Sequence, residues 1–211
     1  MGEPSFKKLR ERMVKEDLSP FIKDTAVLGA FMKVPRENFV HPLLKNLAYI
    51  NKPLPIAYGQ AISQPSMVAL MCETLHIEKN DKILDIGTGS GYQAAILSQL
   101  CGEVISIERI PQLAEEAKKT LKALKYTNIT VVIGDGSQGY KAEAPYDKIV
   151  SAAATKDIPE EWLHQLKEGG ILVYPKYIDN KQILVSVKKR EQQYIPDYHD
   201  YVNFVPLVRS K

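Results

Sequence analysis

The first third of the chain spaces its apolar residues as helices do. Such residues recur three or four positions apart in a charged background over residues 6–14, and residues 26–32 make a second apolar helix. Prolines break the pattern between residues 39 and 58, which we predict to be irregular apart from one short turn or strand. Pro65 suits the first position of a further helix, with apolar residues up to Leu75. Residues 1–78 are therefore expected to form a helical cap.

From residue 79 onward, short apolar runs alternate with helical segments. This alternation is typical of an α/β fold with a doubly wound, mostly parallel sheet. Strands are predicted at residues 82–85, 104–107, 129–133, 147–151 and 171–174, and helices at 92–100, 111–124 and 159–166. Residues 181–188 and 193–207 look like strands with no helix between them, so the short turns there make these last strands antiparallel.

The cap and the α/β core are predicted to belong to one unit. No stretch of linker composition separates residues 1–78 from residues 79–211. We therefore expect a single domain over residues 1–211, with the cap and active-site segment in the first part and a cofactor-binding core in the second.

The overall composition is that of an ordinary folded protein, with 45% hydrophobic and 25% charged residues. The net charge of +3 is small and no block of lysine or arginine is present, so charge does not favour nucleic-acid binding. The longest uncharged stretch, residues 53–72, is interrupted by prolines and predicts no membrane span. Residues 1–15 are dense in charge where a signal peptide would be apolar, so we expect a cytoplasmic protein.

The cysteines and histidines are not spaced as a reactive or metal-binding set. Cys72 and Cys101 lie in apolar, helix-like surroundings, which favours small buried residues over a disulfide, a metal pair or a nucleophile. The four histidines form no spaced ligand set. We expect no metal site.

The segment DIGTGSG (85–91) follows the first predicted core strand and opens a helix. Its glycines allow a tight turn and a close approach of a ligand to the main chain, and the helix N-terminus offers free N–H donors. The spacing of Gly87, Gly89 and Gly91 differs from the Gly-x-Gly-x-x-Gly of dinucleotide-binding proteins. A strand-to-helix turn without any ligand would use the same residues.

Two further strand ends carry carboxylates that suit an adenosine. Glu108 ends the second core strand, where a carboxylate can accept hydrogen bonds from both ribose hydroxyls. Asp135, between Gly134 and Gly136 after the third strand, can reach an adenine amino group. A solvated carboxylate and a simple turn are the structural alternatives, but three strand ends together predict an adenosine site.

S-adenosylmethionine fits these features better than other adenosine cofactors. Tyr177 and Lys181 have the Tyr-x-x-x-Lys spacing of short-chain dehydrogenases, but that pair works from a helix and here straddles a predicted turn. No Lys-Ser/Thr follows the glycines as a P-loop requires. A methyl donor needs neither feature.

The stretch AYGQAISQP (57–65) precedes the third helix and allows two interpretations. Ser63 can cap that helix ahead of Pro65, or its hydroxyl can face a binding surface. No histidine or lysine partner is evident for it, so a nucleophilic role is not expected.

Several segments spread over nearly the whole chain are more specific than the glycine loop. They are VPRENFV (34–40), AYGQAISQP, ILDIGTGSGY (83–92), GDGSQGY (134–140), APYDKIV (144–150) and FVPL (204–207). Together they resemble the protein-L-isoaspartate (D-aspartate) O-methyltransferase family. Two departures are mild: Thr88 stands where the family often has serine, and Ala61 where threonine is common.

The resemblance implies a class I S-adenosylmethionine-dependent methyltransferase fold, Rossmann-like, with an N-terminal helical cap. It implies methyl transfer from S-adenosyl-L-methionine to the α-carboxylate of L-isoaspartyl and D-aspartyl residues, with S-adenosyl-L-homocysteine as product. The ester then collapses to a succinimide, which hydrolyses partly to aspartate and so repairs the protein. The substrates would be isoaspartyl peptides and proteins, and we expect a monomer.

The resemblance also assigns site residues. Ser63 matches the active-site serine of an Ile-Ser-x-Pro motif, and with Ile62 it would lie between cofactor and substrate. A carboxylate is already ionised near neutral pH, so the reaction needs alignment rather than a strong base, metal or covalent nucleophile. The remaining implied cofactor residues are Gly87, Gly89 and Ser90 for the methionine part, Glu108 for the ribose, and Gly134, Asp135 and Gly136 for the adenine side.

Two other functions stay open at this point. A nucleic-acid methyltransferase that acts on a base amine typically carries an Asp/Asn-Pro-Pro-aromatic motif after the fourth strand, where this chain has SAAA (151–154). A carbon-5 pyrimidine enzyme needs a cysteine that commonly follows proline, whereas Met71 and Leu100 precede the two cysteines here. The other alternative is a non-catalytic protein that binds S-adenosylmethionine or its product without turnover, and the intact Ser63, Glu108 and Asp135 argue against such a decayed site.

Overall fold

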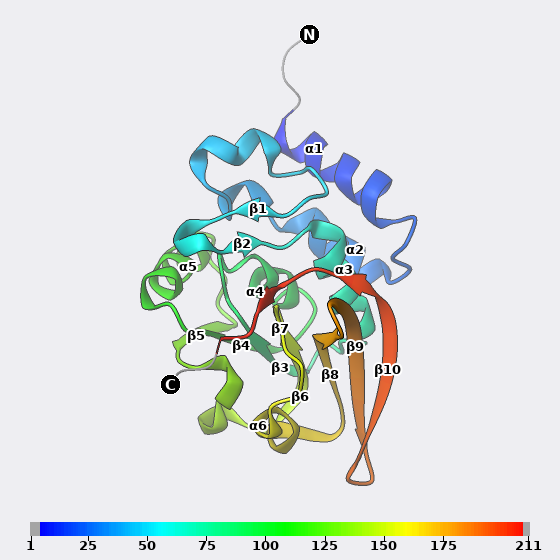
Figure 1. Ribbon diagram of the computed structural model, residues 1–211. Coiled ribbons are helices and arrows are strands. Elements are labelled where there is room, and N and C mark those ends of the chain that lie inside the picture. The colour runs from blue at the N-terminus through cyan, green and yellow to red at the C-terminus, as the bar shows by residue number, and fades with distance from the viewer. Residues whose placement is uncertain (1–4, 209–211) are drawn as a thin grey trace.

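A seven-stranded sheet forms the centre of the computed structural model, which describes residues 5–208 (Figure 1). Its strand order is β10-β9-β8-β6-β3-β4-β5. Adjacent strands are parallel from β8 to β5, and β9 and β10 extend the sheet as antiparallel strands. The prediction of a mostly parallel sheet with antiparallel C-terminal strands is confirmed. Its members are β3 (Lys82–Ile86), β4 (Glu103–Glu108), β5 (Ile129–Ile133), β6 (Tyr146–Ser151), β8 (Leu166–Ile178), β9 (Lys181–Arg190) and β10 (Gln193–Val202).

Helices cover both faces of this sheet. α3 (Pro65–Thr74), α4 (Tyr92–Leu97) and α5 (Pro111–Ala123) contribute to the buried cluster on one face, and α6 (Glu160–Gln165) to the cluster on the other. Neighbouring strand residues such as Ile83 and Leu84 belong to different clusters, because strand side chains alternate between faces. Since both faces are covered, the central strands carry apolar residues on both faces, interrupted by buried polar residues such as Asp85 and Ser106.

The cap packs on the same face as α3 and α4. α1 (Phe6–Met13) continues into a π-helical turn at Val14–Leu18, and α2 (Thr25–Lys33) follows. The guanidinium of buried Arg36 lies 4.7 Å from the ring centre of Tyr92 at the start of α4, and its Nε donates to the carbonyl of Ala48 at 2.8 Å. The contact with Tyr92 attaches the cap to the helix that follows the glycine loop, and the bond to Ala48 holds Arg36 within the cap.

The stretch predicted to be irregular, residues 39–58, contains short turns and one short strand. β1 (Leu54–Pro55) pairs antiparallel with β2 (Ala61–Ile62), which leads into α3. The 3-10 turn Arg36–Asn38 precedes this stretch, and the turns Pro42–Leu47 and Ala57–Gly59 lie in it or at its end. Among residues 5–208, no helix combines the length and the apolarity that a bilayer crossing requires.

The strand order of the sheet reverses between β3 and β6. The chain passes from β3 through α4 to β4 on one side, and from β6 through α6 to β8 on the other. In open α/β sheets, ligands bind outside the carboxyl ends of the strands at such a point. Gly87 and Ala152 follow the two strands there, and the Ala152 N–H donates to the carbonyl of Ile86 at 2.9 Å.

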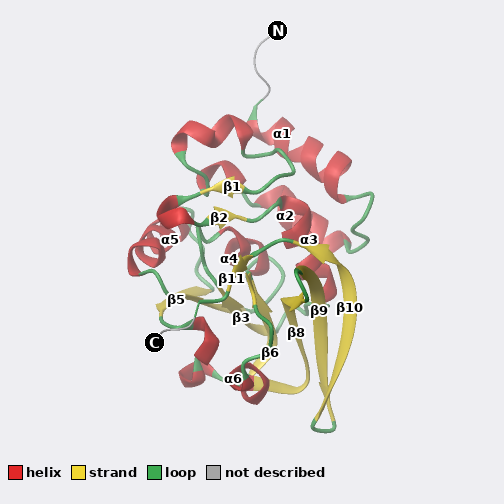
Figure 2. Ribbon diagram, in the orientation of Figure 1, coloured by secondary structure: helices red, strands yellow, loops and turns green. Residues whose placement is uncertain are grey.

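The predicted strand over residues 193–207 is wrong in its extent. β10 ends at Val202, and a separate strand, β11 (Val205–Pro206), pairs parallel with β7 (Ala153–Ala154). Between them, the side-chain amide of Gln182 accepts from the Phe204 N–H at 2.6 Å and donates to the Phe204 carbonyl at 2.9 Å. A side chain therefore replaces the strand partner, and the segment crosses the carboxyl ends of the parallel strands (Figure 2).

Two predicted helices also differ from the structure. The helix predicted at 92–100 ends at Leu97, and the connection between β5 and β6, where no helix is predicted, contains only the 3-10 turns Gly136–Gln138 and Lys141–Glu143. The helix predicted at 159–166 is Glu160–Gln165, and β8 begins immediately afterwards, so that residues predicted to be loop around Gly169 belong to the strand.

Candidate active site

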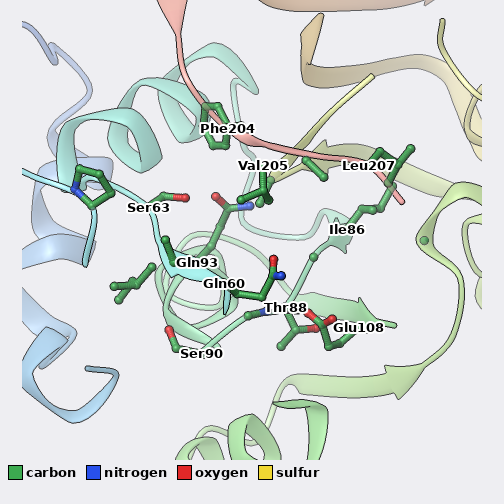
Figure 3. A pocket seen from close by; sticks show the side chains of 18 of the residues that line it. Gln60, Ser63, Ile86, Thr88, Ser90, Gln93, Glu108, Phe204, Val205 and Leu207 are labelled. Atoms are coloured by element: carbon green, nitrogen blue, oxygen red, sulfur yellow. Dashed lines mark hydrogen bonds between the residues drawn. The ribbon is translucent and has the colours of Figure 1, made fainter. Parts of the chain in front are cut away.

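A cavity of about 940 Å³ lies at the carboxyl ends of β3, β4 and β6 (Figure 3). It is lined by the 59–64 stretch before α3, by the loops after β3 and β4, and by residues 201–208. Its floor therefore coincides with the switch point of the sheet, where the fold alone predicts a ligand.

Most of the residues predicted for the site line this cavity. Gly134 and Asp135 do not line the cavity but immediately precede Gly136, which does. The Asp135 carboxylate accepts from the Ser137 N–H at 2.9 Å, as it would in a simple turn. The contact of Asp135 with an adenine stays a prediction. The predicted residues that line the cavity are Ile62, Ser63, Gly87, Gly89, Ser90, Glu108 and Gly136.

The glycine loop uses its N–H groups within the protein. Gly87 and Thr88 both donate to the carbonyl of Ile107, at 2.9 and 3.2 Å. The Gly89 N–H donates to the Glu108 carboxylate at 3.0 Å, and the Gly91 N–H donates to the Thr88 carbonyl at 2.8 Å. The N–H groups of these four loop residues are therefore already bonded, whereas the expected free donors belong to the N-terminus of the helix that follows, α4. A loop arranged in this way does not suit a phosphate, which would need those donors.

Glu108 connects the loop to the next helix. One carboxylate oxygen accepts from the Gly89 N–H and the other from the Ile110 N–H, each at 3.0 Å. The side chain is buried but lines the cavity. A carboxylate oxygen has more than one lone pair, so Glu108 can still accept from a ligand's hydroxyl groups.

A buried polar network supports the loop from below. The Asp85 carboxylate accepts from Ser106 Oγ at 2.7 Å and from Gln93 Nε2 at 2.8 Å, and Ser106 Oγ is 2.6 Å from Thr88 Oγ1. Burial raises the pKa of Asp85 to about 6, although both hydrogen bonds oppose that rise. The network joins the loop to α4 and β4.

Sequence reasoning missed Gln93, which the structure brings to the cavity wall. A signal was present, because Gln93 is the polar residue in an otherwise apolar, fully buried helix, α4. Sequence reasoning also gave the C-terminal segment no place in the site. Phe204, Val205 and Leu207 line the cavity and lie along one edge of it in Figure 3.

Ser63 does not cap the third helix. α3 starts at Pro65 with Gln64 in the capping position, and the Ser66 N–H donates to the side chain of Asn51 at 3.1 Å. The Ser63 hydroxyl points into the cavity, as does the side-chain amide of Gln93 (Figure 3). The cap interpretation is therefore wrong, and the binding-surface interpretation agrees with the geometry.

The cysteines and the Tyr-x-x-x-Lys pair lie apart from the cavity. Cys72 and Cys101 are buried free thiols, as predicted, and burial raises the pKa of both, to about 12 for Cys101. Tyr177 and Lys181 flank the β8–β9 hairpin turn, where no helix holds them. Within the described part of the chain, no three histidine, cysteine or acidic side chains are grouped to hold a metal ion.

A cavity at the switch point, with a ribose-competent carboxylate and with the N–H groups of residues 87–89 already bonded within the protein, fits an adenosine cofactor that lacks phosphates. With this strand order, the fold is that of a class I S-adenosylmethionine-dependent methyltransferase. The chain belongs to the protein-L-isoaspartate(D-aspartate) O-methyltransferase family, whose model matches residues 8–211.

Relatives of similar length support this assignment. A protein-L-isoaspartate O-methyltransferase from Ignicoccus hospitalis is 49% identical over 195 residues, which cover 90% of this chain and 92% of the relative. One from Dictyoglomus thermophilum is 45% identical over 204 residues, covering 97% and 93%. Among solved structures, a β-aspartate methyltransferase from Plasmodium falciparum in complex with S-adenosyl-L-homocysteine is 26% identical, has a TM-score of 0.85, and covers 99% of this chain and 100% of that one.

Proposed function

We propose that this chain transfers a methyl group from S-adenosyl-L-methionine to the α-carboxylate of L-isoaspartyl and D-aspartyl residues in damaged proteins. The observation that carries the proposal is the position of Ser63, whose hydroxyl faces the cavity opposite the glycine loop and is not used to cap α3. The family membership of the chain supplies the reaction class.

The chemistry requires little from the protein besides alignment. A carboxylate oxygen of the substrate forms the new O–CH₃ bond as the CH₃–S⁺ bond breaks, and the electron pair of that bond stays on sulfur to leave S-adenosyl-L-homocysteine. The carboxylate is ionised near pH 7, so no side chain has to remove a proton. In our proposal Ser63 donates its hydroxyl hydrogen to the incoming carboxylate, and Ile62 packs beside it to fix the approach.

The cofactor would lie along the carboxyl ends of the parallel strands. Glu108 would accept from the ribose hydroxyls while keeping its bonds to Gly89 and Ile110. We assign the methionine part to Gly87, Gly89 and Ser90, and the adenine side to Gly134, Asp135 and Gly136. The absence of free loop donors at residues 87–89 supports a cofactor with a cationic rather than an anionic tail.

We further propose that residues 1–211 act as one methyltransferase domain, monomeric and cytoplasmic, with residues 1–78 as the cap. Apolar residues of α1, α2 and α3 share one buried cluster with the sheet, which supports a single unit. Through β2, the cap also supplies the segment that carries Ser63.

Methyl transfer between matched peptides tests the function. The protein is incubated with S-adenosylmethionine labelled in its methyl group and with two peptides that differ only in an isoaspartyl or an aspartyl linkage. We expect label on the isoaspartyl peptide alone. Equal labelling of both peptides, or of neither, would contradict the proposal, and labelling of RNA or DNA instead would establish a nucleic-acid methyltransferase.

The role of Ser63 needs a second measurement. Ser63→Ala should lower kcat for the isoaspartyl peptide by about tenfold to a hundredfold, because a hydrogen bond to a charged group is lost. Its affinity for S-adenosyl-L-homocysteine should change by less than about twofold. Ser66→Ala is the matched control, because it removes the same hydroxyl group from the first turn of α3, at a residue that does not line the cavity. A variant that loses cofactor affinity but keeps kcat would contradict this role.

A further inference from the structure

A buried acceptor without a partner faces the cavity. Gln93 is 7% exposed as a residue, and its Nε2 donates to Asp85 at 2.8 Å. Its Oε1 is buried and has no hydrogen-bond partner among the residues that the structure describes. Buried acceptors in folded proteins are nearly always hydrogen-bonded, since an unpaired one keeps the full cost of leaving water. The cavity is the open side of this group, so a bound molecule can supply the missing donor.

The amide can present only its oxygen to that molecule. If the oxygen and nitrogen exchanged places, Oε1 would face the Asp85 carboxylate, and two acceptors would be in contact. Ser106 donates to the other Asp85 oxygen, which keeps the carboxylate in place. Gln93 therefore acts as an oriented acceptor, and the negative charge of Asp85 behind it favours a cationic donor.

The chemistry of the proposed reactants leaves one group that meets these requirements. The substrate carboxylate and the carboxylate of the cofactor's methionine part are acceptors, so neither can donate to Oε1. The ribose hydroxyls are assigned to Glu108, and the adenine amino group is assigned to Asp135. The remaining donor near the glycine loop is the α-ammonium group of the methionine part, which is also cationic. The Ser63 hydroxyl, which faces the same cavity, is the competing donor from the protein.

We infer that Gln93, held by Asp85, accepts a hydrogen bond from the α-ammonium group of S-adenosylmethionine and of its product. The inference rests on the proposed function, because it names a contact of that cofactor. It makes Gln93 a specificity residue: analogues that keep the adenosine and the sulfur but lack the amino group lose this contact. It also gives Asp85 a positioning role, through the orientation of the amide.

Calorimetric titration of the full chain with two ligands tests the inference. The ligands are S-adenosyl-L-homocysteine and its analogue with hydrogen in place of the amino group. We expect wild type to bind the analogue about tenfold to a hundredfold more weakly, as for a hydrogen bond to a charged group. Gln93→Met, which keeps the length of the side chain, should bind the natural ligand that much more weakly and should bind the analogue as wild type does.

The controls separate the possible failures. Gln99→Met changes the same residue type at an exposed position in the turn after α4 and should bind both ligands as wild type does. An equal loss of both ligands in Gln93→Met would overturn the inference in favour of a structural role or a bond from Ser63. If Gln93→Met does not fold, Gln93→Asn, which keeps the amide but draws it back from the cavity, replaces it: a smaller ratio between the two ligand affinities supports the inference, and an unchanged ratio overturns it. Failure of wild type to bind S-adenosyl-L-homocysteine at all would instead contradict the proposed function.

Discussion

At the scale of single residues, the site depends on side chains that are buried beneath it. Asp85 is fully buried, yet it makes no contact that sequence periodicity could reveal, because its partners Ser106 and Gln93 come from a different strand and from the next helix. The glycine loop above it could be predicted from its spacing. The network that supports the loop could not, because three-dimensional proximity decides it.

Asp85 should make stability fall with rising pH. Its pKa is raised from 3.8 to about 6, so between those values the folded state keeps a proton that the unfolded chain has lost. Stability contributed by this proton is present below pH 4 and is lost as the pH rises through 6. Asp85→Asn removes the titration and can keep both hydrogen bonds. Relative to wild type, its free energy of unfolding should therefore rise by about 2 kcal/mol between pH 4 and pH 7.

Urea denaturation of both proteins at the two pH values measures this difference. Comparing the variants at each pH cancels the titration of all other groups. A difference that does not change with pH would show that Asp85 has the same protonation state in the folded and unfolded chains.

Glu108→Gln should weaken binding of S-adenosyl-L-homocysteine by about tenfold or more. The substitution puts an NH₂ group where one oxygen accepts from the Gly89 or Ile110 N–H, so two donors would meet at 3.0 Å. Glu103→Gln, at the exposed start of the same strand, is the matched control and should bind normally. Calorimetry gives both affinities; equal binding by the two variants would exclude Glu108 from the cofactor site.

At the scale of elements, the alternating strands and helices of the core could be predicted from the sequence. The prediction was wrong where a side chain takes the place of a backbone hydrogen-bond partner. The parallel strands and α5 follow from apolar runs and from Pro111 at a helix start. The β-like composition of β10 continues to residue 207, which is why a strand was predicted over 193–207. The side-chain amide of Gln182 instead bonds the backbone N–H and carbonyl of Phe204, so backbone pairing with β9 ends before that residue. That amide and the pairing of β11 with β7 hold the C-terminal wall of the cavity, and no local pattern predicts either contact.

Two glycines in different elements should respond oppositely to substitution by alanine. Gly91, before α4, has a φ of +89°, and an added Cβ would lie 3.3 Å from the Leu121 side chain. Gly91→Ala should destabilise the protein by about 1–3 kcal/mol. Gly29 lies inside α2 with nothing within 4 Å of an added Cβ. Gly29→Ala should stabilise it by about 0.5–1 kcal/mol.

Thermal or urea unfolding of the two variants gives both signs in one experiment. Because each variant adds a single methyl group, the pair controls for the change in side-chain size. Destabilisation by Gly29→Ala would show that α2 does not have helical geometry at that position.

At the scale of the whole molecule, the edge of the sheet bears on the proposed monomer. β10 is an edge strand with exposed aromatic side chains, including Tyr194 and Tyr198. Pro196 has no N–H to offer a second sheet, and the pairing register shifts between Tyr198 and Tyr201, so the edge is interrupted. Light scattering should therefore give the mass of one chain, and Pro196→Val should increase self-association. A stable dimer of wild type would contradict the proposal.

The α/β class, the antiparallel C-terminal strands, the glycine loop and Glu108 could be predicted from the sequence, because each depends on local pattern or on a strand end, but they account for only part of the cavity lining. The resemblance carried by segments such as VPRENFV gave the family. The orientation of Gln93 and the internal bonds of the glycine loop required coordinates, because they depend on which groups meet across the sheet.

Repair of one peptide over repeated rounds tests the central claim most directly. An isoaspartyl peptide is incubated with the protein and excess S-adenosylmethionine, and its forms are separated by chromatography over time. We predict that the methyl ester appears first, then the succinimide, and that the aspartyl peptide accumulates while the isoaspartyl peptide is consumed; Ser63→Ala should slow every stage. An isoaspartyl peptide that stays unchanged, or an aspartyl peptide that is methylated at the same rate, would contradict the account.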